Sequence, residues 1–346
     1  MTRPSRLAPF LPALFLPALV LLAAGPARTA EPAPAALHVT ARIPGPDGGW
    51  DLGAFDAARR RVYLTHGTSL IEIDADTGKA NMAFAAGDHL HGVVAVPGTD
   101  VLVMSSSADD TARLIDARDG RTLASIPVAA KDADGVAYDP ATGDVVVISA
   151  DGGALTLIDP RQRKAVGSLA LGTPLEFGAP DGAGAFYVNL SDADQVAVVD
   201  LKAMKVTARY PLPGCDKPTG LAYVSGGRVI ADCRNGGVDI LDAHTGKALA
   251  TFTVGGFPDA VLYDAARQLA YVPSALSGTL TVIALAGPKD NTIVATVPTQ
   301  PGARTGAVDP VSGRVWLPTA QYGPPPAPGQ RPRPLPGTFQ VLVLDR

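Results

Sequence analysis

The chain has 346 residues, of which 47% are hydrophobic, 5% aromatic and 18% charged, with 29 basic against 33 acidic side chains. The hydrophobic content is ample for a folded core. The excess of acids argues against nonspecific binding to nucleic-acid backbones, which depends on Lys and Arg.

The N-terminal segment has the pattern of a secretory signal. Arg3 and Arg6 precede an apolar run, and small residues follow up to Ala30. This pattern predicts a signal peptide over residues 1–30 that is cleaved within residues 24–30. An uncleaved membrane anchor is the alternative interpretation.

Cleavage would leave residues 31–36 as a short linker before the folded part. The mature chain would keep 26 basic against 33 acidic side chains, because residues 1–30 hold three arginines and no acid. We therefore expect a periplasmic or secreted protein without a membrane span after cleavage.

From residue 37 onward, a strand-and-turn unit repeats with a nearly constant period. In five copies an apolar strand ends in an aspartate before a turn, at intervals of 41 to 43 residues. These aspartates are Asp74, Asp116, Asp159, Asp200 and Asp242. A further interval of 42 reaches Ala284 in a degenerate copy, and a seventh copy ends at Asp345. A period of about 40–45 residues with four short strands predicts an all-β fold, a single seven-bladed β-propeller over residues 37–346.

The two ends of the repeat array complement each other. Residues 37–43 read as a strand with no blade of its own, and the last blade, from Ala303, has only three strands. We predict that the N-terminal strand joins the last blade and closes the ring, which removes open sheet edges.

A proline-rich insertion interrupts the last blade at residues 322–337. It contains seven prolines, which favours an extended, exposed loop. The loop is either a tolerated insertion or a polyproline surface for a partner.

In a propeller, the loops that enter each inner strand and the loops that follow each second strand meet at one end of the central channel. Aligning the seven copies gives nine candidate ligand-binding residues at this mouth. They are Asp51, His91, Asp134, Glu176, Asn189, Arg234, Asn235, Asp259 and Arg304. Carboxylates and arginines of this kind would orient a polar ligand by charge-assisted hydrogen bonds.

Three interpretations of the mouth remain open: a salt-bridged rim without a ligand, a site for a small polar molecule or a protein partner, and a metal-assisted hydrolytic site. The third would use Glu176, Asn189 and Asp259 as oxygen ligands for a divalent cation. The chain contains no HExxH, nucleophile-elbow, Walker or CxxCH haem motif. No catalytic residue is therefore assigned, and a protein without catalysis or cofactor is favoured.

The two cysteines lie in the fifth copy. Cys215 precedes its inner strand and Cys233 ends the strand that folds back, so that residue 219 would face roughly residue 233. In an exported protein this pair is a candidate disulfide. Two unlinked thiols are the alternative, because Cys215 lies four residues before residue 219 and could be farther from Cys233 than the ~5.5 Å Cα separation that a disulfide needs.

Several segments of the chain resemble the YncE-like, YVTN-repeat family of exported seven-bladed propellers, and the likeness extends over residues 37–346. The matching segments are 174–177, 186–189, 215–222, 233–235, 296–305 and 316–320. The resemblance implies an exported ring that binds something without an established common reaction. One branch of the family is associated with DNA in the periplasm, and similar propellers include lactonases.

These observations lead to one preferred function and two others. The preferred function is an exported, non-catalytic propeller whose channel mouth binds a small polar ligand or a partner protein. The alternative is a metal-dependent, lactonase-like hydrolase, and a periplasmic DNA-binding propeller comes third because the mature chain is acidic.

Overall fold

The computed structural model describes Met1 and residues 36–286, 290–327, 330 and 332–346. Apart from Met1, the predicted signal peptide lies outside these residues, as does the predicted linker apart from Ala36. Ala36–Arg346 form one compact unit. Within the described residues, no helix has the length and apolar character needed to cross a membrane.

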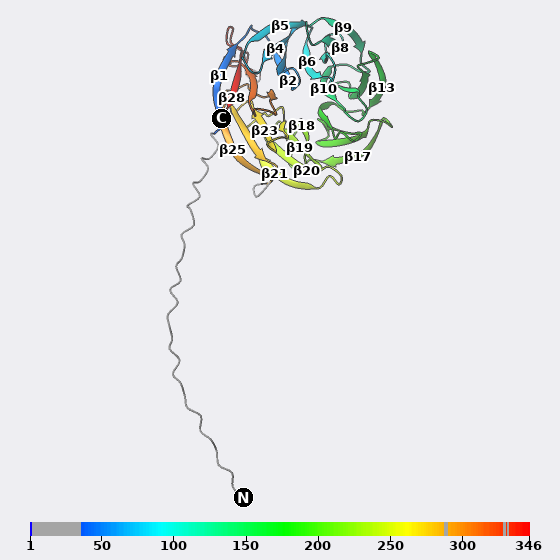
Figure 1. Cartoon of the computed structure of the whole chain (residues 1–346), viewed down its shortest axis with the longest axis vertical. Coiled ribbons are helices and arrows are strands. Elements are labelled where there is room, and N and C mark those ends of the chain that lie inside the picture. The colour runs from blue at the N-terminus through cyan, green and yellow to red at the C-terminus, as the bar shows by residue number, and fades with distance from the viewer. Residues whose placement is uncertain (2–35, 287–289, 328–329, 331) are drawn as a thin grey trace. The chain divides into compact units, whose positions relative to one another are not determined.

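Seven four-stranded antiparallel sheets make up this unit (Figure 1). Six of them take their four strands in chain order. The first three are β2 (Trp50–Asp56), β3 (Arg61–His66), β4 (Ser69–Asp74), β5 (Ala80–Ala86); β6 (Leu90–Ala95), β7 (Val101–Ser106), β8 (Thr111–Asp116), β9 (Thr122–Pro127); and β10 (Ala133–Tyr138), β11 (Val145–Ser149), β12 (Ala154–Asp159), β13 (Lys164–Ala170).

The next three are β14 (Leu175–Pro180), β15 (Ala185–Leu190), β16 (Gln195–Asp200), β17 (Lys205–Pro211); β18 (Pro218–Val224), β19 (Arg228–Cys233), β20 (Gly237–Asp242), β21 (Ala248–Thr253); and β22 (Leu262–Asp264), β23 (Leu269–Ser274), β24 (Thr279–Ala284), β25 (Thr292–Pro298). The sheets stand side by side around a common centre (Figure 1), which is the predicted seven-bladed propeller.

The seventh sheet combines the two ends of the folded unit. Its order is β1 (His38–Pro44), β28 (Gln340–Asp345), β27 (Val315–Thr319) and β26 (Ala307–Val308). β1 runs antiparallel to β28, with His38 opposite Asp345 and Pro44 opposite Gln340. The N-terminal strand thus completes the last blade, as the sequence predicts.

The recurring aspartates form the turns between the third and fourth strands. The Oδ1 atom of Asp242 accepts hydrogen bonds from the backbone N–H groups of His244 (3.0 Å) and Thr245 (2.8 Å). Gly246 follows with a φ of +70°, a conformation that favours glycine. These repeated residues therefore have a structural role.

The core lies between neighbouring blades. Tyr63 and Leu70 of the first sheet pack with Leu102, Met104 and Ile115 of the second, and all five side chains are fully buried. The outermost strands are more exposed, and β17 alternates between exposed and half-buried positions. Because the sheet faces are used for packing, the inner end of each blade is left to form the channel.

A disulfide joins Cys215 to Cys233, with a Cα–Cα distance of 5.5 Å. The residue opposite Cys233 is Pro218, whereas the sequence predicts Thr219. The register of β18 against β19 is irregular between Pro218 and Leu221, and this irregularity displaces the pairing by one residue.

The described part of the proline-rich loop folds back on itself. Leu335 N–H donates to Gln321 O (2.8 Å), and Gly323 N–H donates to Arg333 O (3.1 Å). Tyr322 and Leu335 are exposed, which agrees with the predicted exposed insertion.

Candidate functional site

The same two-residue pattern occurs in each blade, at the start of the inner strand in five blades and four residues before it in the sixth and seventh. The first residue of the pattern is buried, and it is apolar in every blade. The seven buried residues are Trp50, Leu90, Ala133, Leu175, Pro218, Pro258 and Ala303. Since successive side chains of an extended segment point to opposite sides, the next residue points away from the core in six blades, whereas in the fifth it is fully buried. This next residue is Asp51, His91, Asp134, Glu176, Thr219, Asp259 or Arg304.

Six of these seven residues line one cavity of about 450 Å³, which we call the central cavity. All seven blades contribute to its wall. Its charged lining consists of seven acids and four basic side chains: Asp51, Asp132, Asp134, Asp151, Glu176, Asp192, Asp259, His91, Lys217, Arg234 and Arg304. Seven of the nine predicted site residues are thus brought together.

Asn189 and Asn235 do not line the central cavity, contrary to the prediction. Asn189 is fully buried, and its Nδ2 atom donates to Thr219 O (2.8 Å) and Gly220 O (3.1 Å), which links the fourth blade to the fifth. Asn235 Nδ2 donates to Gly214 O (2.9 Å). The end of a second strand directs its side chain between sheets, so the proposed ligand set of Glu176, Asn189 and Asp259 is not assembled.

Several lining residues are absent from the sequence-based prediction. Asp132, Lys217 and Phe257 each directly precede the buried first residue of a blade, with φ values of +65°, +56° and +60°. Such values are uncommon outside glycine and are marked outliers for bulky residues. The sequence gives no signal for Lys217 and Phe257, because neither belongs to the residue types that favour positive φ, and Asp132 is only one of many aspartates in turns. Asp151 and Asp192 follow the second strands of their blades as exposed loop residues.

Two arginines pair with acids inside the cavity. Arg304 Nε lies 2.9 Å from Asp259 Oδ2, and its Nη2 lies 3.7 Å from Asp51 Oδ1. Arg234 Nη2 donates to Glu176 Oε1 at 2.9 Å. Burial lowers the pKa of Arg304, but the charges of Asp259 and Asp51 outweigh this effect and raise it above the ordinary value, so Arg304 stays charged.

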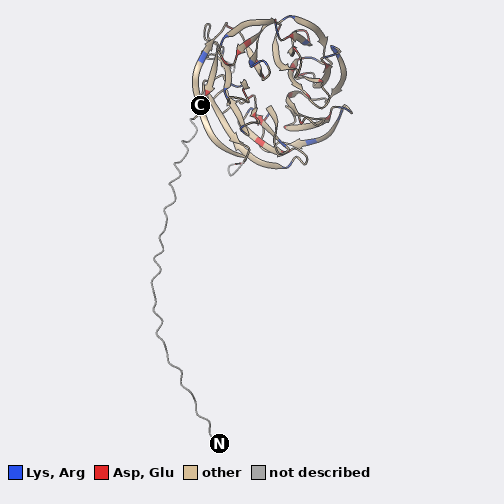
Figure 2. Cartoon of the chain, viewed as in Figure 1, with Lys and Arg blue, Asp and Glu red and all other residues tan. Residues whose placement is uncertain are grey.

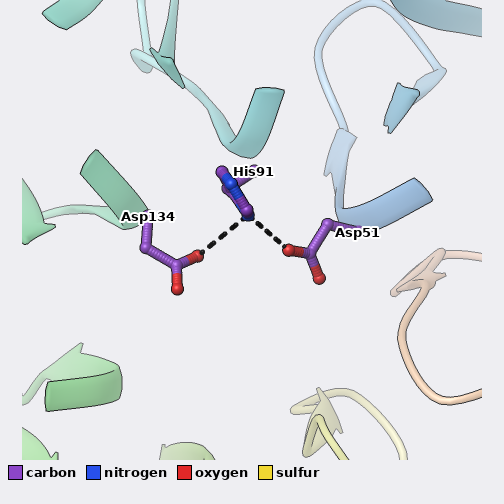
Figure 3. Close-up of side chains that lie close together, drawn as sticks. All are labelled: Asp51, His91 and Asp134. Carbon is purple, nitrogen blue, oxygen red and sulfur yellow. Dashed lines mark hydrogen bonds and ion pairs between the residues drawn. The ribbon is translucent and has the colours of Figure 1, made fainter. Parts of the chain in front are cut away.

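A histidine lies between two carboxylates on the adjoining blades (Figure 3). His91 Nδ1 lies 2.7 Å from Asp51 Oδ2 and 3.7 Å from Asp134 Oδ1, and its Nε2 lies 3.0 Å from Ser107 Oγ. Burial lowers the pKa of His91, but the Asp51 hydrogen bond and the Asp134 charge raise it to about 9. The two neighbouring acids therefore favour the protonated form of His91.

The same three residues are the candidate metal ligands of the cavity. One ligand atom from each of Asp51, His91 and Asp134 lies within 4.8 Å of the others. A metal ion would first have to displace the proton of His91, because only neutral imidazole coordinates metals. At neutral pH the arrangement acts as an internal ion pair.

Negative charge is in excess within the cavity. Burial and the Asp51 charge raise the pKa of Asp134 well above its ordinary value, and His91 opposes this shift. Burial and the Asp259 charge raise the pKa of Glu176 to about 8, against the opposing charge of Arg234. The lining holds seven acids against four basic side chains, so the cavity can accept a further positive charge.

No known family model and no curated protein matches the chain. Its fold is similar to that of a chain in Kuenenia stuttgartiensis hydrazine synthase, with 15% identity, a TM-score of 0.68, and coverage of 80% of this chain and 92% of the other. It is also similar to a chain of the mitotic checkpoint complex (12% identity, TM-score 0.73, coverage 96% and 99%). The WD40 repeats of RRP9 give 10% identity, a TM-score of 0.75, and coverage of 89% and 97%. Identities this low support the propeller fold alone, and membership of the YncE-like family stays a prediction.

Proposed function

We propose that this protein is an exported, non-catalytic β-propeller that binds a small, positively charged molecule in the central cavity. The observation that carries the proposal is the lining of that cavity, where seven carboxylates face three Lys or Arg side chains and His91. A volume of about 450 Å³ suits a small molecule.

The charge balance favours a cation over an anion as the ligand. Arg304 and Arg234 already contact Asp259 and Glu176, so they attract an added anion weakly. A cation would instead meet carboxyl groups whose pKa is raised by burial and by neighbouring acids. Its binding would lower the pKa of these carboxyls, form charge-assisted hydrogen bonds and release protons to solvent.

Export is proposed from two sequence features. One is the predicted signal peptide over residues 1–30, and the other is the resemblance to an exported propeller family. The disulfide between Cys215 and Cys233 supports export, because such bonds persist in oxidising compartments.

A protein partner is the second candidate ligand. One structural neighbour is a chain of an assembly, the mitotic checkpoint complex. We favour the small molecule because the charged residues line a cavity rather than a raised surface.

The test is titration calorimetry with putrescine, a diamine, and with 1,4-butanediol, a neutral molecule of similar length. We expect putrescine alone to bind and Asp134→Asn to weaken it about tenfold, the effect of losing roughly 1.4 kcal/mol of charge interaction. Repeating the titration in buffers of different ionisation enthalpy should reveal proton release.

The matched control is Asp119→Asn, which neutralises an exposed carboxylate in an outer turn. This variant should bind putrescine like the wild type. Absent putrescine binding, or equal binding by the Asp134→Asn variant, would contradict the proposal.

A further inference from the structure

An apolar depression adjoins the central cavity. It has a volume of about 310 Å³, and we call it the apolar shelf. Its main side chains are Phe257, Leu276, Pro301 and Tyr322. Phe257 and Arg304 line both the shelf and the central cavity, so the two spaces adjoin each other at these side chains.

The shelf exposes apolar side chains to solvent. Leu276 is 72% exposed and Tyr322 is 37% exposed. The tyrosine ring is nevertheless held in place, because it packs edge-on against Trp50 with ring centroids 6.4 Å apart. A Cβ atom at Gly302 would come within 2.4 Å of the Tyr322 ring, so the glycine makes this close packing possible.

Phe257 stands between the charged and the apolar parts. Its φ of +60° is held by hydrogen bonds from its N–H to Arg234 O (3.2 Å) and from Ala275 N–H to its own carbonyl (3.0 Å). The guanidinium of Arg234 lies 5.9 Å from the centre of the Phe257 ring. The surrounding contacts thus fix an aromatic ring in an uncommon backbone conformation at the junction.

We propose that the ligand is an amphipathic amine, with its ammonium group in the central cavity and its apolar or aromatic group on the shelf. This inference rests on the proposed function and specifies the class of ligand. Arg304 would repel the amine little, because it pairs with Asp259. Arg234 is engaged by Glu176 Oε1 at 2.9 Å, and an amine that ionises Glu176 would strengthen this pair.

The positions of the blades fit such a ligand. Asp132 and Asp134 enter from the third blade, whereas Phe257 and Leu276 belong to the sixth. In a ring of seven these blades lie on opposite sides of the channel (Figure 1). A molecule that reaches across the channel would meet the carboxylates at one end and the shelf at the other.

The experiment compares three probes by titration calorimetry at neutral pH. Ethylamine carries the charge alone, 2-phenylethanol carries the apolar group alone, and phenethylamine carries both. We expect phenethylamine to bind at least tenfold more tightly than either of the other two, since its phenyl ring leaves water on the shelf.

The matching variant is Leu276→Ser, which changes a mostly exposed side chain and should leave folding intact. It should weaken phenethylamine about fivefold and leave ethylamine unchanged. Val311→Ser, at another exposed apolar residue outside both cavities, should change neither affinity.

The outcomes separate this inference from the proposed function. If ethylamine and phenethylamine bind equally and Leu276→Ser changes neither affinity, the shelf does not bind the apolar group. The proposed cation site would not be contradicted by that result. Failure of all amines, putrescine included, would overturn the proposed function and this inference together.

Discussion

At the scale of single residues, the fifth blade departs from the pattern of the other six. Its Thr219 is buried, and its Oγ1 donates to Asp232 Oδ1 at 2.7 Å. Burial raises the pKa of Asp232 to about 7, against the bonds from Thr219 and from Gly220 N–H. This blade reaches the central cavity through Lys217 and Arg234 instead, so its contribution to the wall is basic.

The pKa of Glu176 predicts how stability depends on pH. Burial and Asp259 raise this pKa from 4.5 to about 8, so the folded protein keeps a proton that the unfolded chain has released. The free energy of unfolding should therefore fall as pH rises from about 4.5 to about 8. In the Glu176→Gln variant the free energy of unfolding should lack this pH-dependent decrease, which is on the order of a few kcal/mol.

Urea unfolding at pH 5, 6.5 and 8.5 would measure the difference between Glu176→Gln and the wild type. Asp119→Asn serves as the control for loss of an exposed acid. Parallel pH profiles for wild type and Glu176→Gln would mean that Glu176 is ionised in the folded protein at neutral pH.

At the scale of elements, the disulfide connects the segment before β18 with the end of β19. Arg234 directly follows Cys233, and its N–H donates to Lys217 O at 3.1 Å. The covalent link therefore holds in place a segment that supplies two basic side chains to the central cavity.

Reduction of this disulfide should destabilise the protein. The two cysteines are 18 residues apart, and closing a loop of this size contributes about 3 kcal/mol. We expect the urea midpoint to fall with reductant and the untreated protein to show no free thiols. The Cys215→Ser/Cys233→Ser double variant should not respond to reductant, and two free thiols in the untreated wild type would disprove the link.

At the scale of the whole molecule, the pairing of β1 with β28 closes the ring. Leu37 and Val39 pack with a cluster that includes Leu342 and Leu344, and Ile43 packs with the cluster of the first blade. The closing strand thus connects the last blade to both of its neighbours in the ring.

Truncation tests the contribution of this strand. The free energy of unfolding should be lower by on the order of 3–5 kcal/mol for a chain that starts at residue 45 than for one that starts at residue 37. The reason is that loss of β1 leaves apolar side chains of β28 uncovered. Denaturant unfolding and light scattering would measure stability and association through the exposed edge. Equal stability of the two chains would show that the other three strands suffice.

Charge is also distributed over the whole ring. Figure 2 shows Lys and Arg dispersed among acidic residues rather than gathered into one basic stripe. Backbone-directed binding of nucleic acids depends on such a stripe, so the arrangement gives the DNA-binding hypothesis no support.

The architecture and much of the cavity could be predicted from the sequence, because both follow from one period. Steps of about 42 residues from Asp74 give the equivalent turn in each blade. The inner strand lies at a similar distance before each turn, which locates Asp51, His91 and Glu176. The period does not predict the direction of a side chain at the end of a strand. For this reason the sequence places Asn189 in the cavity, whereas its side chain is buried between two blades. Nor does a period reveal that Phe257 adopts a positive φ, since that depends on contacts between blades.

The charged residues that line the central cavity come from different sheets, and this has a consequence for how such proteins diversify. Asp51, Asp134 and Glu176 each stand on a different blade, beside a buried neighbour that anchors the strand. A substitution at one of them alters the chemistry of the channel without repacking any sheet. Related rings could therefore acquire new preferences one blade at a time, and a combinatorial library restricted to these few codons would sample many ligand classes on an unchanged scaffold.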